Sequence, residues 1–184
     1  GRQEPTLLVA EQQTAGRGRL GREWHTGTYE GTGLLPALTF SLGLPLAPHD
    51  WSGLSLAVGV SVADSIQPEI PRDDSGVPHV GLKWPNDLVV CGAGNQPQKV
   101  AGILLEERGG VLLAGIGINV CWAPPAEQMR ADAALEATCL ENLHKSITIV
   151  HYTAEALWQT LVKRMFSAYI GCHSFSEGWR KRAE

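Results

Sequence analysis

The stretch KVAGILLEERGGVLLAGIGINV, residues 99–120, decides the fold. It contains two apolar runs, KVAGILLEE and VLLAGIGINV, with Arg108, Gly109 and Gly110 at the junction. Short apolar runs joined by a glycine-bearing turn are typical of an antiparallel hairpin. Two more such runs, VGLKW at residues 80–84 and LVVC at residues 88–91, come before it. The spacing predicts an antiparallel meander at the centre of the molecule.

Outside the meander, the apolar pattern predicts two further strands and several helices. TLLVAE reads as a strand at residues 6–11, and LLPALTFSL as a buried strand at residues 34–42. A helix is expected over residues 51–66 with Asp50 as its cap, because Leu54, Ala57, Val58 and Val62 share one face. Residues 67–79 contain three prolines and read as a surface loop. Further helices are expected at residues 133–143, at residues 154–170 and from Ser174 onward.

Composition excludes several classes of protein. A chain of 184 residues with 43% hydrophobic and 18% charged residues suits one globular domain. A formal net charge of −4 argues against a general nucleic-acid binder. The longest apolar stretch is too short to span a bilayer, and no signal peptide is recognisable. The cysteines form no CxxC pair, which favours a reducing cytosolic compartment over a disulfide framework or structural zinc; they are Cys91, Cys121, Cys139 and Cys172.

The segment AEQQTAGRGRLGREW, residues 10–24, is the first candidate for chemistry. Three arginines alternate with three glycines in it: Arg17, Arg19 and Arg22 with Gly16, Gly18 and Gly21. Glycines let backbone N–H groups approach an anion, and arginines add forked donors for phosphate or carboxylate. The pattern predicts a mobile loop that wraps a small anionic ligand; we call residues 10–24 the Gly/Arg loop.

Other interpretations of the Gly/Arg loop are weaker. GRGRLG fits the dinucleotide-binding pattern G-x-G-x-x-G, but no helix is predicted after it. No acidic residue follows at the spacing of about 20 positions that a Rossmann fold requires. A solvated surface turn and an RGG-like contact with RNA remain as alternatives.

A second constellation is KWPND, residues 83–87. Pro85 prevents a helix and favours an extended Trp84, so a tight turn would present Lys83, Asn86 and Asp87 together. The alternative is an ordinary solvated turn, because Pro, Asn and Asp are common turn residues.

Glycines inside predicted strands make the third constellation. Gly102, Gly115 and Gly117 interrupt runs that are otherwise apolar, Lys99 begins one of these runs and Asn119 ends the other. Such glycines mark a place where something approaches the backbone closely. They predict a floor for a flat ligand, with crowded sheet packing as the alternative.

Together these motifs resemble a known family. QQTAGRGRLGREW, LKWPNDL, KVAGILLE and GIGINV occur in the order and at about the separations found in biotin protein ligases, and the stretch through FSEGW is similar to the end of their catalytic domain. The resemblance implies an α/β (α+β) fold, in which a mixed, mostly antiparallel sheet carries helices on one side, similar to class II tRNA synthetases. Residues 1–184 are then expected to form one catalytic domain. The family's Ser-Thr-Asn segment, which precedes the Gly/Arg loop, and its C-terminal SH3-like domain are expected to be absent.

The resemblance also implies an activity. Biotin and MgATP would give biotinyl-5′-AMP and pyrophosphate, and a lysine of a biotin carboxyl carrier protein, such as an acetyl-CoA carboxylase subunit, would then accept biotin. A cytoplasmic enzyme without membrane or nucleic-acid partners is expected. The family includes monomers and dimers, so a homodimer stays open. The alternatives are a lipoate or octanoyl protein ligase and a non-catalytic biotin or adenylate binder.

The resemblance assigns roles to individual residues. Arg17, Lys83 and Lys99 would be catalytic, with Arg17 facing the biotin carboxylate and the α-phosphate. Asp87 would be on the magnesium side. The biotin side would comprise Gln13, Gly16, Arg17, Gly18, Arg19, Lys99, Gly102 and Ile103. The nucleotide side would comprise Arg22, Trp24, Lys83, Asn86 and Asn119, with Trp24 against the adenine.

Overall fold

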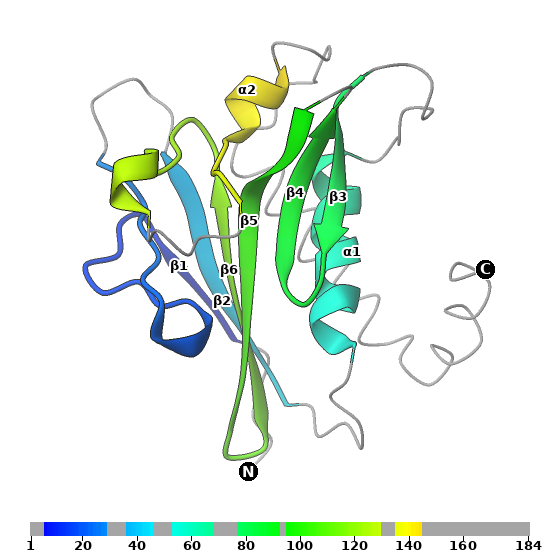
Figure 1. The fold of residues 1–184 in the computed structure, drawn as a ribbon. Coiled ribbons are helices and arrows are strands. Elements are labelled where there is room, and N and C mark those ends of the chain that lie inside the picture. The colour runs from blue at the N-terminus through cyan, green and yellow to red at the C-terminus, as the bar shows by residue number, and fades with distance from the viewer. Residues whose placement is uncertain are drawn as a thin grey trace, which may run out of the picture.

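The fold is seen in a computed structural model of the chain (Figure 1). It describes residues 6–28, 36–45, 53–67, 77–92, 95–129 and 135–144. The predicted helices at residues 154–170 and from Ser174, and most of the predicted loop at residues 67–79, lie outside these ranges.

A six-stranded sheet forms the centre of the molecule, in the order β1-β2-β6-β5-β4-β3. All of its paired strands are antiparallel. The four strands from β3 to β6 pair in sequence order, so the predicted meander is confirmed, as is the predicted antiparallel character of the sheet. The strands are β1 (Thr6–Ala10), β2 (Ala37–Leu44), β3 (His79–Lys83), β4 (Asp87–Gly92), β5 (Asn95–Arg108) and β6 (Val111–Asn119).

The hairpin between β5 and β6 follows from its turn residues. Gly109 and Gly110 have φ angles of 60° and 79°, which residues with side chains rarely adopt. Glu107 accepts a 2.7 Å hydrogen bond from the backbone N–H of Gly110. The turn sets the register Arg108 to Val111, and through it Gly102 lies opposite Gly117.

Helix α1 (Leu54–Ile66) packs on one face of the sheet, against β3, β4 and β5. Val58 and Val62, on its predicted apolar face, are buried in the main core together with side chains from β2 to β6. Gly59 permits this close packing, because a Cβ there would lie 2.8 Å from Leu82 Cδ2. The predicted start of this helix was wrong: it begins at Leu54 with Gly53 as N-cap, in a left-handed conformation, and Asp50 lies outside the described residues.

The predicted helix at residues 133–143 was also wrong over residues 135–139, which are not helical. Of the described residues in that range, 135–143, the helical ones belong to α2 (Leu140–His144). Ala137 instead forms a parallel bridge with Lys99, in which Lys99 N donates to Glu136 O and Thr138 N donates to Lys99 O. The edge of β5 at Lys99 offers hydrogen-bond partners to this segment, and they override its helical propensity.

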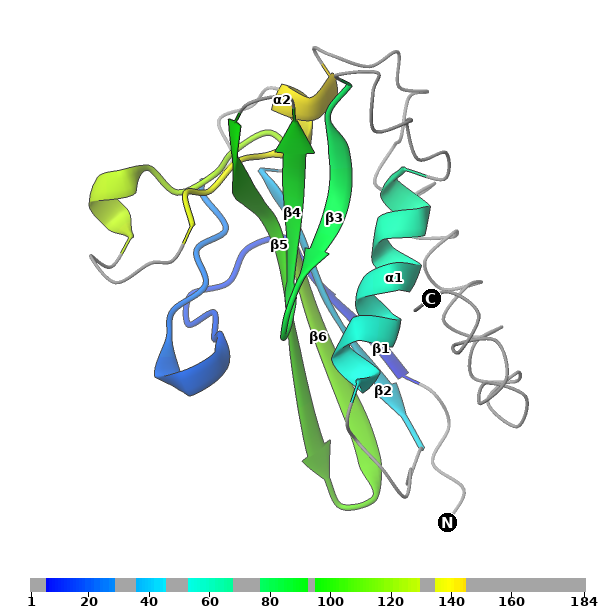
Figure 2. The same ribbon diagram turned by 45° about the vertical axis from the view of Figure 1, so that its right-hand side comes forward.

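The second face of the sheet carries the Gly/Arg loop. Figure 2 shows α1 on one side of the strands, and residues 11–28 with the 3₁₀ turn at Ala126–Gln128 on the other. In the described parts of the chain, no helix has the length and apolarity needed to cross a membrane. The strands thus separate a packed core, under α1, from a face that the loops cover.

Candidate active site

The Gly/Arg loop is folded back on itself by backbone hydrogen bonds. Trp24 N donates to Gly16 O at 3.0 Å, and Gly18 N donates to Arg22 O at 2.7 Å. A Cβ on Gly16 would overlap the carbonyl of Trp24, so this close crossing requires glycine. At the tip, Leu20 is 85% exposed and has a φ angle of 58°, in the left-handed region. Residues 25–28, directly after the loop, are not helical, and the next described element is strand β2, which agrees with the rejection of a Rossmann turn.

Two of the three glycines predicted to form a floor, Gly102 and Gly117, lie opposite each other, and the ring of Trp24 lies on them. Gly102 of β5 pairs with Gly117 of β6. A Cβ on Gly117 would lie 2.5 Å from Trp24 Cζ2, and one on Gly102 would lie 3.3 Å from Trp24 Cζ3. The buried indole N–H has no hydrogen-bond partner among the described residues. Trp24, assigned by resemblance to the adenine, therefore covers the floor that was expected to carry a flat ligand.

Lys99 lies above the same floor. Its Nζ is 2.8 Å from Asp87 Oδ1 and 5.9 Å from the centroid of the Trp24 ring. It is also 3.4 Å from the position that a Cβ on Gly102 would take. The side chains of Lys99 and Asp87 are only 27% and 19% exposed, so this ion pair is better shielded from water than a surface pair.

A bulge in β5 points Lys99 toward this face. Leu88 of β4 lies opposite Ala101, but the next residue, Val89, lies opposite Lys99, so Val100 is the extra residue. Strict alternation from Gly102 would place Val100 on the floor side and Lys99 on the α1 side. The bulge instead lets Val100 join the apolar core, where it is 0% exposed.

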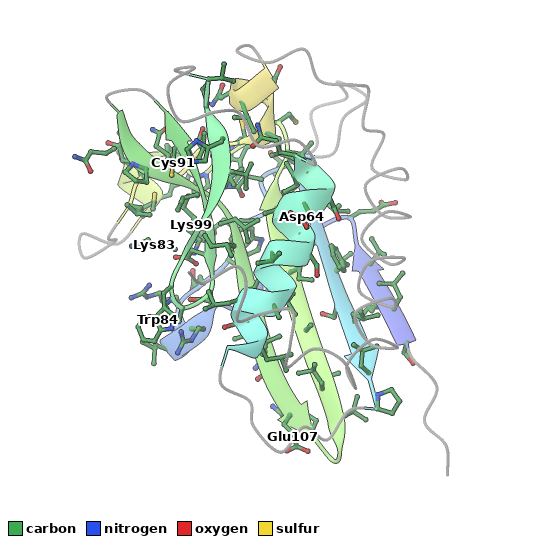
Figure 3. All side chains as sticks on the ribbon, turned by 90° about the vertical axis from the view of Figure 1, so that its right-hand side faces the viewer. Asp64, Lys83, Trp84, Cys91, Lys99 and Glu107 are labelled. Atoms are coloured by element: carbon green, nitrogen blue, oxygen red, sulfur yellow. The ribbon has the colours of Figure 1, made fainter. Side chains whose placement is uncertain are left out.

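The predicted turn at residues 83–87 is confirmed. Lys83 and Asp87 pair across it, with residues 84–86 in the turn. Ser55 of α1 donates to Pro85 O at 2.7 Å and anchors the turn to the helix. Trp84 at its tip is 77% exposed. Figure 3 shows Lys83 and Trp84 on the same part of the molecule as Lys99, and all three line one cavity.

Asn86 is held by the backbone of Ile103. Ile103 N donates to Asn86 O at 2.9 Å, and Asn86 Nδ2 donates to Ile103 O at 2.8 Å. The side chain of Ile103 is buried, with its Cδ1 3.5 Å from the Cβ position of Gly59 in α1. Ile103 thus contributes to the site by fixing Asn86, whose Oδ1 is 3.5 Å from Arg19 Nη1.

Arg17 is tied to the sheet by a residue that sequence reasoning missed. Arg17 Nη2 lies 3.1 Å from Glu106 Oε2, and Glu106 Oε1 lies 3.8 Å from Arg108 Nη2. Glu106 was overlooked because an acidic residue at the end of an apolar strand carries no signal of its own. Its pairing with Arg17 spans 89 residues and exists only in the folded chain.

Two overlapping cavities are lined by most of the predicted site residues. One, of about 500 Å³, is lined by residues including Gln13, Arg17, Gly18, Arg19, Lys99, Gly102 and Ile103. The other, of about 740 Å³, is lined by residues including Arg22, Trp24, Lys83, Asn86, Asp87 and Asn119. Gly16 lines the wider opening around the loop. The structure therefore brings every predicted site residue to one region.

Asn119 is the most buried polar residue of this set, with 2% exposure. Its Nδ2 donates to Thr138 O at 2.9 Å, and its Oδ1 has no partner among the described residues. An unsatisfied buried acceptor is costly, so a donor on a ligand in the adjoining cavity would be favoured there. Thr138, whose carbonyl oxygen accepts this hydrogen bond, was not predicted as part of the site, because a helix was predicted over residues 133–143.

Comparison with known proteins identifies the family. Residues 2–121 match the family model of the Biotin/lipoate A/B protein ligase family. The chain belongs to this family. Among family members, the biotin--[acetyl-CoA-carboxylase] ligase of Mycobacterium tuberculosis (strain ATCC 25618 / H37Rv) is 40% identical over 127 residues, which cover 69% of this chain and 43% of that protein. The bifunctional ligase/repressor BirA of Bacillus subtilis (strain 168) is 33% identical over 156 residues, covering 80% of this chain and 43% of that protein. The chain thus spans less than half the length of these two relatives.

Solved structures of similar proteins agree with the observed fold. The biotin protein ligase from Aquifex aeolicus in complex with biotin and ATP is 30% identical, with a TM-score of 0.62 and coverage of 90% of this chain and 60% of that one. The biotin protein ligase from Leishmania major in complex with biotinyl-5-AMP has a TM-score of 0.68, 23% identity and coverage of 89% and 64%. At that identity, the Leishmania structure supports the fold alone.

Proposed function

We propose that this chain carries the catalytic site of an ATP-dependent biotin protein ligase. The observation that carries the proposal is the placement of Lys99, held by Asp87, above the Gly102–Gly117 floor and beside the arginines of the Gly/Arg loop. Such a site suits a flat ligand that bears an anionic tail. The names of the Mycobacterium tuberculosis and Aquifex aeolicus relatives support biotin as that ligand.

The first half-reaction brings two anions together. A carboxylate oxygen of biotin bonds to the α-phosphorus of ATP, the bond from that phosphorus to the bridging oxygen breaks, and pyrophosphate leaves. Lys99 and Arg17 would neutralise the repulsion between carboxylate and phosphate, and fixed donors stabilise the charge that grows at phosphorus. Lys83 and Arg22 both line the cavity of about 740 Å³, and they would bind the nucleotide phosphates. Magnesium would enter with ATP and offset the charge of the leaving pyrophosphate.

The second half-reaction transfers biotin to a protein. The amine of an acceptor lysine bonds to the carbonyl carbon of biotinyl-5′-AMP, the bond to AMP breaks, and the nitrogen releases one proton. The adenylate hydrolyses readily, so a loop that excludes water protects it. The acceptor is proposed to be a biotin carboxyl carrier domain in the cytoplasm. Homodimer formation stays a prediction, which sedimentation analysis would test.

A lipoyl ligase is the second candidate, because the family name covers both chemistries. The Gly/Arg loop and KWPND, which the resemblance ties to biotin ligases, favour biotin. A non-catalytic biotin or adenylate binder would use the same cavities but would form no adenylate.

Pyrophosphate exchange tests the proposal. Labelled pyrophosphate should enter ATP in the presence of magnesium and biotin, but not with lipoate or octanoate. Arg17→Ala and Lys99→Ala should each lower the exchange rate on the order of 100-fold, as expected for loss of one charge-stabilising donor. Glu107→Gln, at the distant hairpin turn (Figure 3), is the matched control and should stay within about twofold. Unchanged exchange in both alanine variants would refute the proposal.

A further inference from the structure

We infer that Asp87 is a positioning residue that holds Lys99 in place, and that it is not a magnesium ligand. The inference rests on the proposed function and revises the role that resemblance assigns to this carboxylate. It starts from the 2.8 Å contact between Asp87 Oδ1 and Lys99 Nζ.

The backbone builds this contact from two strands. Asp87 begins β4 opposite Gly102, and the bulge at Val100 turns Lys99 to the same face as Gly102. A second pairing fixes Lys99 from its other side, through the hydrogen bonds with Glu136 and Thr138. The base of the lysine side chain is therefore rigid, while its four-carbon stem keeps its rotational freedom unless a partner holds the ammonium. Asp87 is the only carboxylate that the described residues place against that ammonium.

Magnesium does not fit this carboxylate well. The ion usually binds one or two carboxylates together with substrate phosphates. Among the residues that the structure describes, no three His, Cys, Asp or Glu side chains form a metal-binding group, so a magnesium ion here would depend on Asp87 together with the substrate phosphates. The two other acidic residues lining these cavities have partners of their own: Glu106 is paired with Arg17, and Glu23 Oε2 lies 3.7 Å from His25 Nε2. A cation bound at Asp87 would also be repelled by the ammonium of Lys99.

Holding Lys99 has a direct consequence for the proposed reaction. An ammonium fixed above the floor meets the ligand's carboxylate without first losing side-chain freedom. A displacement of about 1 Å in such a group can lower a rate 100-fold. Asp87 would thus act entirely through Lys99, so its removal should matter little once Lys99 is gone.

The test compares Asp87→Asn, Lys99→Ala and the double variant in biotin-dependent pyrophosphate exchange, each titrated with free magnesium. Asp87→Asn should lower the maximal rate about 10- to 100-fold. Its half-saturating magnesium concentration should stay within about twofold of the parent, and the double variant should be no more than about threefold slower than Lys99→Ala. Asp87→Ser is measured alongside, so that the result does not depend on one variant folding, and Glu107→Gln controls for the loss of one negative charge.

Two results would overturn the inference while leaving the proposed function intact. One is a rise of tenfold or more in half-saturating magnesium for both Asp87 variants, which is the behaviour of a metal ligand. The other is a full additional loss in the double variant, which would mean that Asp87 acts independently of Lys99. Absence of biotin-dependent exchange in the parent chain would instead refute the proposed function, and this inference with it.

Discussion

The indole of Trp24 lies on the α-carbon of Gly117, at the point where Gly117 pairs with Gly102 across β5 and β6. The two glycines leave a flat area of sheet without side chains, and the ring fills it. Lys99 Nζ, 5.9 Å from the ring centroid, adds a weak cation–π contact. The Gly/Arg loop is therefore joined to the floor through its last residue, Trp24, and a ligand that binds there must share the floor with this ring or displace it.

Gly117→Ala should destabilise the protein by about 1–3 kcal/mol, because the new methyl group overlaps the Trp24 ring in a packed site. Urea unfolding followed by circular dichroism measures this change. Gly115→Ala is the matched control on the same strand, since a Cβ there would have its nearest contact at 3.6 Å. Adding Trp24→Ala should relieve most of the Gly117→Ala cost; equal costs with and without the tryptophan would contradict the observed contact.

Gly16→Ala should impair the loop more than Gly18→Ala. A Cβ on Gly16 overlaps the backbone carbonyl of Trp24, whereas one on Gly18 has ordinary contacts at 3.5 Å with Arg22. Backbone atoms cannot move aside as a flexible side chain can, so the hydrogen bond from Trp24 N to Gly16 O should break. We expect at least a tenfold greater loss of pyrophosphate exchange for Gly16→Ala, corresponding to about 1.4 kcal/mol. Similar losses in both variants would mean that the loop does not close in this way.

Glu106→Gln should loosen the Gly/Arg loop without unfolding the protein. Arg17 is 65% exposed, so its ion pair with Glu106 should contribute no more than about 1 kcal/mol to the free energy of unfolding. Limited trypsin digestion should nevertheless cut faster at Arg17, Arg19 or Arg22 in the variant, because the loop loses a tether to β5. Glu107→Gln, one residue along the strand, is the control and should leave the cleavage rate unchanged.

The thiols of Cys91 and Cys121 should react slowly with alkylating reagents. Burial raises the pKa of the Cys91 thiol above its ordinary value of 9.0. Burial also raises the pKa of the Cys121 thiol, with further increases from the nearby Glu141 and Cys139. A higher pKa leaves less reactive thiolate at a given pH, so at pH 8 both residues should be alkylated more slowly by iodoacetamide than in the urea-unfolded chain.

Peptide mass spectrometry would read the alkylation of each cysteine separately. In the folded protein, the alkylation rate of each thiol should still increase with pH above pH 9. A thiol with the ordinary pKa of 9.0 is already mostly ionised there, so its rate would change little. Equal rates in folded and unfolded protein at pH 8 would show that the two thiols are not shielded.

The amino-acid sequence by itself determined the elements that rest on local patterns. The hairpin at residues 99–120 follows from apolar runs joined by Gly109 and Gly110, whose left-handed conformations suit a tight turn. The turn at residues 83–87 and the apolar face of α1 follow from equally local chemistry. Local patterns singled out the Gly/Arg loop, the turn at residues 83–87 and the glycines inside strands, and the resemblance to biotin protein ligases supplied the remaining site residues and the role of each.

Only the tertiary structure decided how those residues meet. The bulge at Val100, which points Lys99 to the floor, depends on the pairing of β4 with β5 and has no signature in the residues around it. The same edge of β5 holds residues 136–138 extended, where local propensity predicts a helix. Glu106 reaches Arg17, and Trp24 reaches Gly117, across 89 and 93 positions respectively. Contacts between residues so far apart in the sequence depend on the register of the strands and on how loops pack against the sheet. Both are interactions between distant segments, and no local pattern encodes them.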